Sequence, residues 1–164
     1  MGFLDSLLGK TKLPEAKTDK LFAISTAAIT LEASLGYRPD GAAGVCIKPM
    51  ESSHYETVRR EIEELLAMSM KETGTEYRLQ KDEYNYLWVV LSDPDLDDLV
   101  NAIQMVAQIL TEQGFGIQIL AAVFRFRGEA VIYWIYNFKQ GAYYPFVPQS
   151  GRQRDTAREF RLKA

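Results

Sequence analysis

Few residues in this sequence have the types and the spacing that chemistry requires. Cys46 is the one cysteine and His54 the one histidine, and the two together could form a nucleophile and its base. Cys46 alternates with Val45 and Ile47 in a segment typical of a strand, which favours a small buried side chain instead. A single cysteine and a single histidine exclude a zinc finger, a two-histidine metal motif and an internal disulfide. We therefore expect no catalytic dyad and no metal.

Three further patterns match ligand motifs only in part. Residues 9–11 (Gly-Lys-Thr) match the end of a phosphate-binding loop, but Leu4 occupies the place of its first glycine. Residues 114–116 (Gly-Phe-Gly) lack the third glycine of a dinucleotide fingerprint and follow a helical segment, as a helix C-cap does. The acidic run 93–98 lacks the glycine and distal glutamate of a calcium loop, and its Asp-Pro start suits a helix with Asp93 as N-cap. The sequence therefore predicts a non-enzymatic protein without a cofactor.

The composition is that of an ordinary globular domain. The chain has 164 residues, of which 47% are hydrophobic and 25% charged, and a chain of this size buries about two-thirds of its surface. The net charge of −3 gives no overall bias toward nucleic acid. The charges are unevenly distributed, because residues 121–164 hold eight Lys or Arg against three Asp or Glu, whereas residues 1–120 hold eleven against nineteen. Folding could therefore produce a basic side and an acidic side.

The first residues of the chain give the clearest indication of a binding function. Four large apolar residues at helical spacing precede two lysines: Phe3, Leu4, Leu7, Leu8, Lys10 and Lys12. This pattern predicts a short amphipathic helix followed by a linker, together residues 1–17, that contacts a membrane surface or a partner protein. Packing against its own domain is the alternative. No apolar stretch is long enough to span a membrane, and no basic signal region begins the chain. We expect a cytoplasmic protein, peripheral at the inner face of the cell membrane.

Hydrophobic periodicity divides residues 18–164, which we expect to form a single domain. Helices are expected over 18–25, 53–70 and 94–113. Strands are expected over 27–33, 44–48, 76–80, 84–91, 117–127, 129–138 and 142–147, with a turn over 37–41 and a further edge strand over 159–163. The strand over 84–91 is apolar on both faces and should lie inside the sheet. The pattern predicts an α+β fold with a curved, mostly antiparallel sheet of about seven strands and three helices mainly on one face.

Aromatic residues are concentrated in the last third of the chain. Such residues fill a core beneath helices, line a protein-binding groove, or stack on single-stranded nucleic acid. We expect most of them to fill the core and expect no nucleic-acid partner. Four aromatic residues on neighbouring predicted strands remain candidates for a cleft or groove: Tyr86, Trp88, Tyr133 and Tyr143.

Short motifs in a fixed order resemble a known family. They lie at residues 1–10, 30–36, 44–49, 84–88, 112–116, 144–148 and 154–155. Together they span nearly the whole chain and resemble the PspAB-type proteins, which are associated with phage-shock protein A. Asn85 stands where the resemblance implies a glycine, and Ile47 where it implies a phenylalanine.

The resemblance implies a prokaryotic protein that accompanies phage-shock protein A, which maintains membranes under envelope stress. It implies no catalytic residue. Our main hypothesis is therefore a non-enzymatic adaptor that uses a protein-binding surface together with its amphipathic N-terminus. The alternative hypothesis is a small-ligand-binding regulatory domain with an aromatic cleft. Both hypotheses are compatible with a homodimer.

Overall fold

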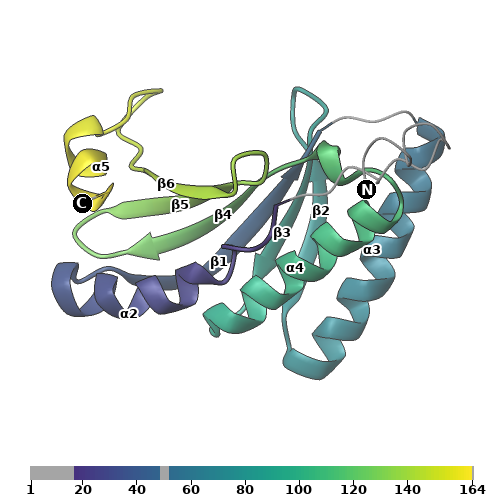
Figure 1. The fold of residues 1–164 in the computed structure, drawn as a ribbon, viewed down its shortest axis with the longest axis horizontal. Coiled ribbons are helices and arrows are strands. Elements are labelled where there is room, and N and C mark those ends of the chain that lie inside the picture. The colour runs from purple at the N-terminus through teal and green to yellow at the C-terminus, as the bar shows by residue number, and fades with distance from the viewer. Residues whose placement is uncertain (1–16, 49–51, 164) are drawn as a thin grey trace, which may run out of the picture.

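The computed structural model describes residues 17–48 and 52–163 (Figure 1). The elements follow in the order α2 (Ala23–Leu35), β1 (Arg38–Ile47), α3 (Ser52–Thr73), β2 (Glu76–Lys81), β3 (Leu87–Ser92), α4 (Leu96–Glu112), the 3-10 turn η1 (Gly116–Gln118), β4 (Ile119–Arg127), β5 (Val131–Asn137), β6 (Ala142–Phe146) and α5 (Thr156–Lys163). The expected α+β class is confirmed. Within these ranges the sheet has six strands instead of seven, with four helices.

All six strands pair antiparallel, in the order β2-β3-β1-β4-β5-β6. Helices α2, α3 and α4 lie on one side of the sheet (Figure 1). The alternate side chains that point to this side form one continuous hydrophobic core, which includes Val45, Val89, Ala122 and Tyr136. We call this side the covered face.

Helix α4 forms where its sequence pattern places it. Its apolar residues recur at helical spacing and are buried: Leu99, Ile103, Val106 and Leu110. The N-cap is Asp95, whose side chain accepts from the N–H of Asp97. The expectation that Asp93 caps this helix is wrong. Asp93 is instead buried, and its carboxylate accepts hydrogen bonds from the Thr75 hydroxyl and the Asp95 N–H, so it joins the start of β2 to the start of α4.

The expected short helix over 18–25 and strand over 27–33 are wrong, because one helix, α2, begins at Ala23 and contains the whole of the expected strand. Its buried residues Ile24, Ala28 and Leu31 follow a helical repeat, whereas Ile29 is 73% exposed. The β-branched residues that favour a strand locally are therefore overridden by packing of the helical stripe on the core.

The expected turn over 37–41 and the expected edge strand over 159–163 are also wrong. Strand β1 already begins at Arg38 and passes an irregularity between Pro39 and Ala43, where Gly41 has a φ of 73°. Residues 156–163 form helix α5, in which Glu159 and Leu162 are buried three residues apart.

The loop between β2 and β3 is organised by Asp82. Its carboxylate accepts from the N–H groups of Tyr84 and Tyr86 and from the Trp88 indole. Asn85 has a φ of 67°, in the left-handed region that glycine and asparagine tolerate best. This conformation accounts for asparagine where the family resemblance implies glycine.

Candidate functional site

In the part of the chain that the structure describes, no helix packs on the second face of the sheet, which we call the open face. One row of paired residues crosses five strands of this face, in the order Val90, Gly44, Val123, Ile135 and Tyr144. The three aliphatic side chains of the row are half-buried, and Tyr144 is 36% exposed. The solvent-exposed face of an antiparallel sheet ordinarily carries polar side chains. An apolar row of this length therefore marks the open face as a candidate interaction surface.

Small residues near the middle of the open face leave a shallow depression. Its volume is about 180 Å³, and it is lined by Ala42, Ala43, Gly44, Val90, Val123, Arg125 and Tyr133. Arg125 and Arg127 bond the Asp40 carboxylate at 2.8 and 3.0 Å, and these bonds lower the pKa of that carboxyl, with Arg127 the larger cause. The depression therefore offers an apolar floor beside a charge cluster in which two arginines share one carboxylate.

Trp88 extends the open face toward β2. Its indole donates to Asp82 at 2.9 Å, and across the strand pair it lies opposite Cys46. Burial and the Asp82 charge raise the pKa of the Cys46 thiol to about 11. A thiol with this pKa is almost entirely protonated at neutral pH and is a poor nucleophile.

The possible base of the dyad contacts a different residue. His54 lies near the start of α3, is exposed, and its ring packs at 5.2 Å from the ring of Phe115. Among the described residues, no group of three His, Cys, Asp or Glu side chains is placed to hold a metal ion.

The four predicted cleft residues do not share one cleft. Trp88 and Tyr133 lie on the open face, whereas Tyr143 pairs with Tyr136 on the covered face, their ring centroids 4.8 Å apart. Tyr86 precedes β3 in the Asp82 loop. Burial raises the pKa of the Tyr143 hydroxyl well above its ordinary value, and that hydroxyl donates to the Leu21 carbonyl.

A deeper hollow lies at the covered face, between α2, α5 and the floor formed by β5 and β6. It has a volume of about 520 Å³ and is lined by Ala23, Ile24, Ala27, Thr30, Leu31, Ser34, Leu35, Trp134, Tyr143, Arg161 and Leu162. Of the four predicted cleft residues, only Tyr143 lines this hollow. The hollow could not be expected from the sequence, because two of its walls are the helices α2 and α5, whose residues 27–33 and 159–163 were predicted as strands.

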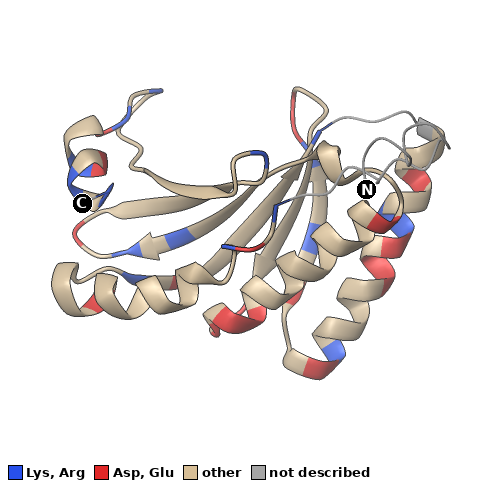
Figure 2. Cartoon of the chain, viewed as in Figure 1, with Lys and Arg blue, Asp and Glu red and all other residues tan. Residues whose placement is uncertain are grey.

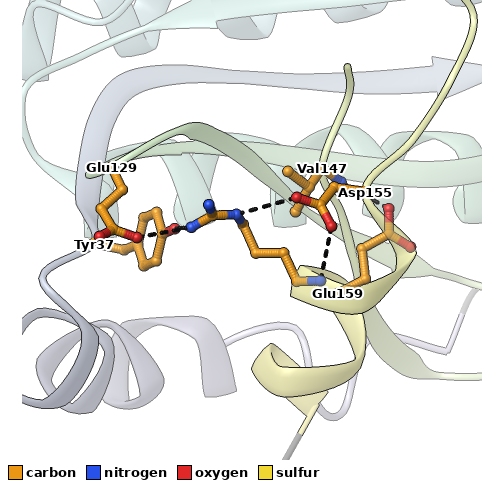
Figure 3. Close-up of polar contacts among 6 residues, drawn as sticks. Tyr37, Glu129, Val147, Asp155 and Glu159 are labelled. Carbon is orange, nitrogen blue, oxygen red and sulfur yellow. Dashed lines mark hydrogen bonds and ion pairs between the residues drawn. The ribbon is translucent and has the colours of Figure 1, made fainter.

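Helix α5 is held at one wall of this hollow by charged groups (Figure 3). The Arg158 guanidinium donates to the Tyr37 hydroxyl at 2.7 Å and to Glu129 at 2.9 Å, and it contacts Asp155 at 3.4 Å. The Glu159 carboxylate accepts from the Val147 N–H at 2.9 Å. These bonds join α5 to the end of β6 and to the segment that follows α2.

A second guanidinium completes the anchor of α5. The Arg154 side chain donates to Glu159 through two nitrogens, at 3.0 and 2.7 Å, and also lies over the Phe146 ring. The bonds from Arg154, followed by the bond from Val147, lower the pKa of the Glu159 carboxyl.

The charge asymmetry of the sequence is visible in the fold. Acidic residues lie along α3 and at the start of α4, and basic residues are frequent on β4 and in the C-terminal segment (Figure 2).

The predicted contact residues of the N-terminal segment lie outside the described residues: Phe3, Leu4, Leu7, Leu8, Lys10 and Lys12. None of the described helices has the length and apolar character needed to cross a membrane.

The whole chain can be compared with known proteins. No curated protein matches it significantly. Residues 1–164 match the family PspAB, described as PspA associated protein B. The match covers every element from the N-terminal segment to α5, so the chain belongs to the PspAB family of PspA-associated proteins.

Proposed function

We propose that this chain is a non-enzymatic adaptor that binds a PspA-like protein through its open sheet face and serves the envelope-stress response. The observation that carries the proposal is the apolar row across five strands, in a chain whose family is described as PspA-associated. The raised pKa of the Cys46 thiol, which makes it a poor nucleophile, favours a binding role over catalysis.

The open face has the dimensions of a protein interface. Six strands at about 4.8 Å spacing and about 20 Å length give roughly 600 Å² in projection. A standard interface buries about 800 Å² on each partner, and side-chain relief makes the accessible area larger than the projection. The depression beside Gly44 would accept one large apolar side chain of the partner, the arrangement typical of an interface hot spot.

Residues 1–17 form the second part of the proposal. Their apolar residues, with the two lysines, would add a contact to the partner or to an anionic membrane surface, while residues 18–164 act as the binding domain. A peripheral position at the inner face of the cell membrane follows from this arrangement.

The experiment is a binding titration between the purified full chain and the purified PspA homologue of the same cells. Ile135→Lys places a charge within the apolar row of the open face, and Ile29→Lys makes the same change at an exposed site on α2. We expect Ile135→Lys to weaken binding by roughly a hundredfold and Ile29→Lys to leave it unchanged. Equal binding by both variants, each with an unchanged melting temperature, would contradict the open face as the site.

A chain lacking residues 1–12 separates the two parts of the proposal. Retained binding would place the partner site on residues 18–164, and lost binding would make the N-terminal segment the main contact. Sedimentation of the chain alone would reveal a homodimer, and a dimer abolished by Ile135→Lys would make a second copy the occupant of the open face.

A further inference from the structure

We propose that the hollow between α2 and α5 binds a long-chain carboxylic acid, with its hydrocarbon chain between the helices and its carboxylate at Arg161. This site lies on the covered side of the sheet and is independent of the open face. Figure 1 shows α2 and α5 at the same end of the sheet, beside β5.

The hollow exists because of small residues on α2. Ala23, Ala27, Thr30 and Ser34 form one stripe of this helix and line the hollow. Larger side chains in the stripe would close the space against Trp134 and Tyr143. The bonds of Arg158 and Glu159 hold α5 to neighbouring segments, so the helix does not depend on contact with α2 for its position.

The size and lining of the hollow suit an acyl chain. Ligand sites usually measure about 300–1,000 Å³ and are mainly apolar, and this one measures about 520 Å³. At about 30 Å³ for a group the size of a water molecule, it holds on the order of seventeen such groups, which corresponds to one long hydrocarbon chain. Most of its lining is aliphatic or aromatic, with the Thr30 and Ser34 hydroxyls as minor polar groups.

The charge at the hollow selects an acid. Arg161 is the one charged residue of the lining, and it is exposed to solvent. The acidic groups of α5 and its approach are already engaged, since Asp155 bonds Arg158 and Glu159 bonds Arg154. Over residues 17–48 and 52–163, Arg161 forms neither an ion pair nor a side-chain hydrogen bond, although its charge helps to lower the pKa of Asp155. Its guanidinium is therefore available to a carboxylate.

The two tryptophans of the chain provide a direct assay. Trp134 lines the hollow, whereas Trp88 lies on the open face. Trp88→Phe in the full chain therefore leaves a single emitter at the proposed site. The probe is 9,10-dibromostearic acid below its micelle concentration, because its bromine atoms quench indole emission only at contact distance. Stearic acid and methyl stearate serve as unbrominated competitors.

We expect saturable quenching of Trp134 that stearic acid reverses. Ala27→Phe, which fills the hollow, should weaken binding by about tenfold or more, whereas Ala33→Phe on another side of the same helix should not. Arg161→Gln should weaken binding by roughly fivefold, and Lys163→Gln, the matched loss of charge on α5, should change it by less than about twofold.

Quenching that does not saturate, or that is equal in the Ala27→Phe and Ala33→Phe variants, would overturn the proposal. Competition by methyl stearate as strong as that by stearic acid would overturn the assignment of the carboxylate to Arg161. Thermal unfolding of each variant checks that it folds, and Ala27→Leu replaces Ala27→Phe if the larger side chain prevents folding. None of these readings depends on a PspA homologue, so they are separable from the test of the adaptor function.

Discussion

Replacing Glu159 with Gln tests how helix α5 is attached to the sheet. The Glu159 side chain is 7% exposed and accepts hydrogen bonds from two nitrogens of Arg154 and from the Val147 N–H. Gln keeps the size of the side chain but loses its charge, and its amide NH₂ cannot accept from the guanidinium. Arg154 is 46% exposed and regains water when it is released, so the loss should lie near the lower end of the range for charge-assisted hydrogen bonds, about 1.5–2 kcal/mol.

The expected result is a lower melting temperature at neutral pH. At about 2–4 °C per kcal/mol for a domain of this size, Glu159→Gln should lower the melting temperature by about 3–8 °C. Circular dichroism at 222 nm measures this change, and Glu64→Gln, an exposed site on α3, provides the matched control. A double-mutant cycle with Arg154→Gln should give a coupling close to the effect of the single Glu159 change.

The pH dependence of the melting temperature provides a second test of the same bond. Because Arg154 and Val147 lower the pKa of folded Glu159 below its value in the unfolded chain, the stabilisation is fully present above the unfolded pKa, near 4.3. It is lost as the pH falls through the folded pKa. The difference in melting temperature between the native chain and Glu159→Gln should therefore be constant from pH 7 to about 5 and shrink below pH 4. A difference that is equal at pH 7 and pH 3, or below 1 °C at pH 7, would refute the carboxylate–guanidinium bond as the attachment of α5.

Three further predictions concern other parts of the fold. Since burial and the Asp82 charge raise the pKa of Cys46 to about 11, its reaction with a thiol reagent should be at least about a hundredfold slower in the native chain than in urea at pH 7.5; equal rates would refute the burial. Asp93→Ala removes the carboxylate that accepts from the Thr75 hydroxyl and the Asp95 N–H and should reduce the free energy of unfolding by about 2 kcal/mol in a urea titration, and an unchanged midpoint would contradict these bonds. Gly128→Ala would place its Cβ 2.7 Å from the Gly36 carbonyl oxygen and should cost about 1–3 kcal/mol, whereas a melting temperature equal to that of the native chain would show that the turn is free to move.

Elements with a consistent local signal could be predicted from the sequence. Helix α4 combines acidic residues at its start with a single apolar stripe, and both features favour the same helix. Strand β3 is apolar on both faces, which correctly indicated an interior position between β2 and β1. In each case local preference and tertiary packing agree.

Elements with a mixed local signal could not be predicted from the sequence. The alternation of Glu159, Phe160, Arg161 and Leu162 is typical of a strand, but in α5 the acidic Glu159 is buried and Phe160 is 77% exposed. The sequence pattern assigns burial by hydrophobicity alone, whereas Glu159 is buried because Arg154 and a backbone N–H satisfy its charge. A partner that lies five residues away and approaches through a loop leaves no periodic trace.

The candidate sites were hard to predict for a different reason. Strand β1 pairs with β3 and β4, neither of which is joined to it by a short turn. The row that crosses the open face therefore depends on non-local strand order, which local turn signals do not contain. The aromatic residues were singled out as one group, but their division between two faces follows from strand register, and a shift of one residue would reverse it.

This division by register makes the two candidate surfaces separable. Side chains of one strand alternate between the faces, so Trp134 on the covered face and Ile135 on the open face are neighbours in sequence but point to opposite sides of β5. Substitutions whose side chains do not touch usually act additively. A change at Ile135 that alters partner binding should thus leave the quenching of Trp134 unchanged, and a filled hollow at Ala27 should leave partner binding unchanged. A coupling between the two would require movement of the sheet itself, because no side chain belongs to both surfaces.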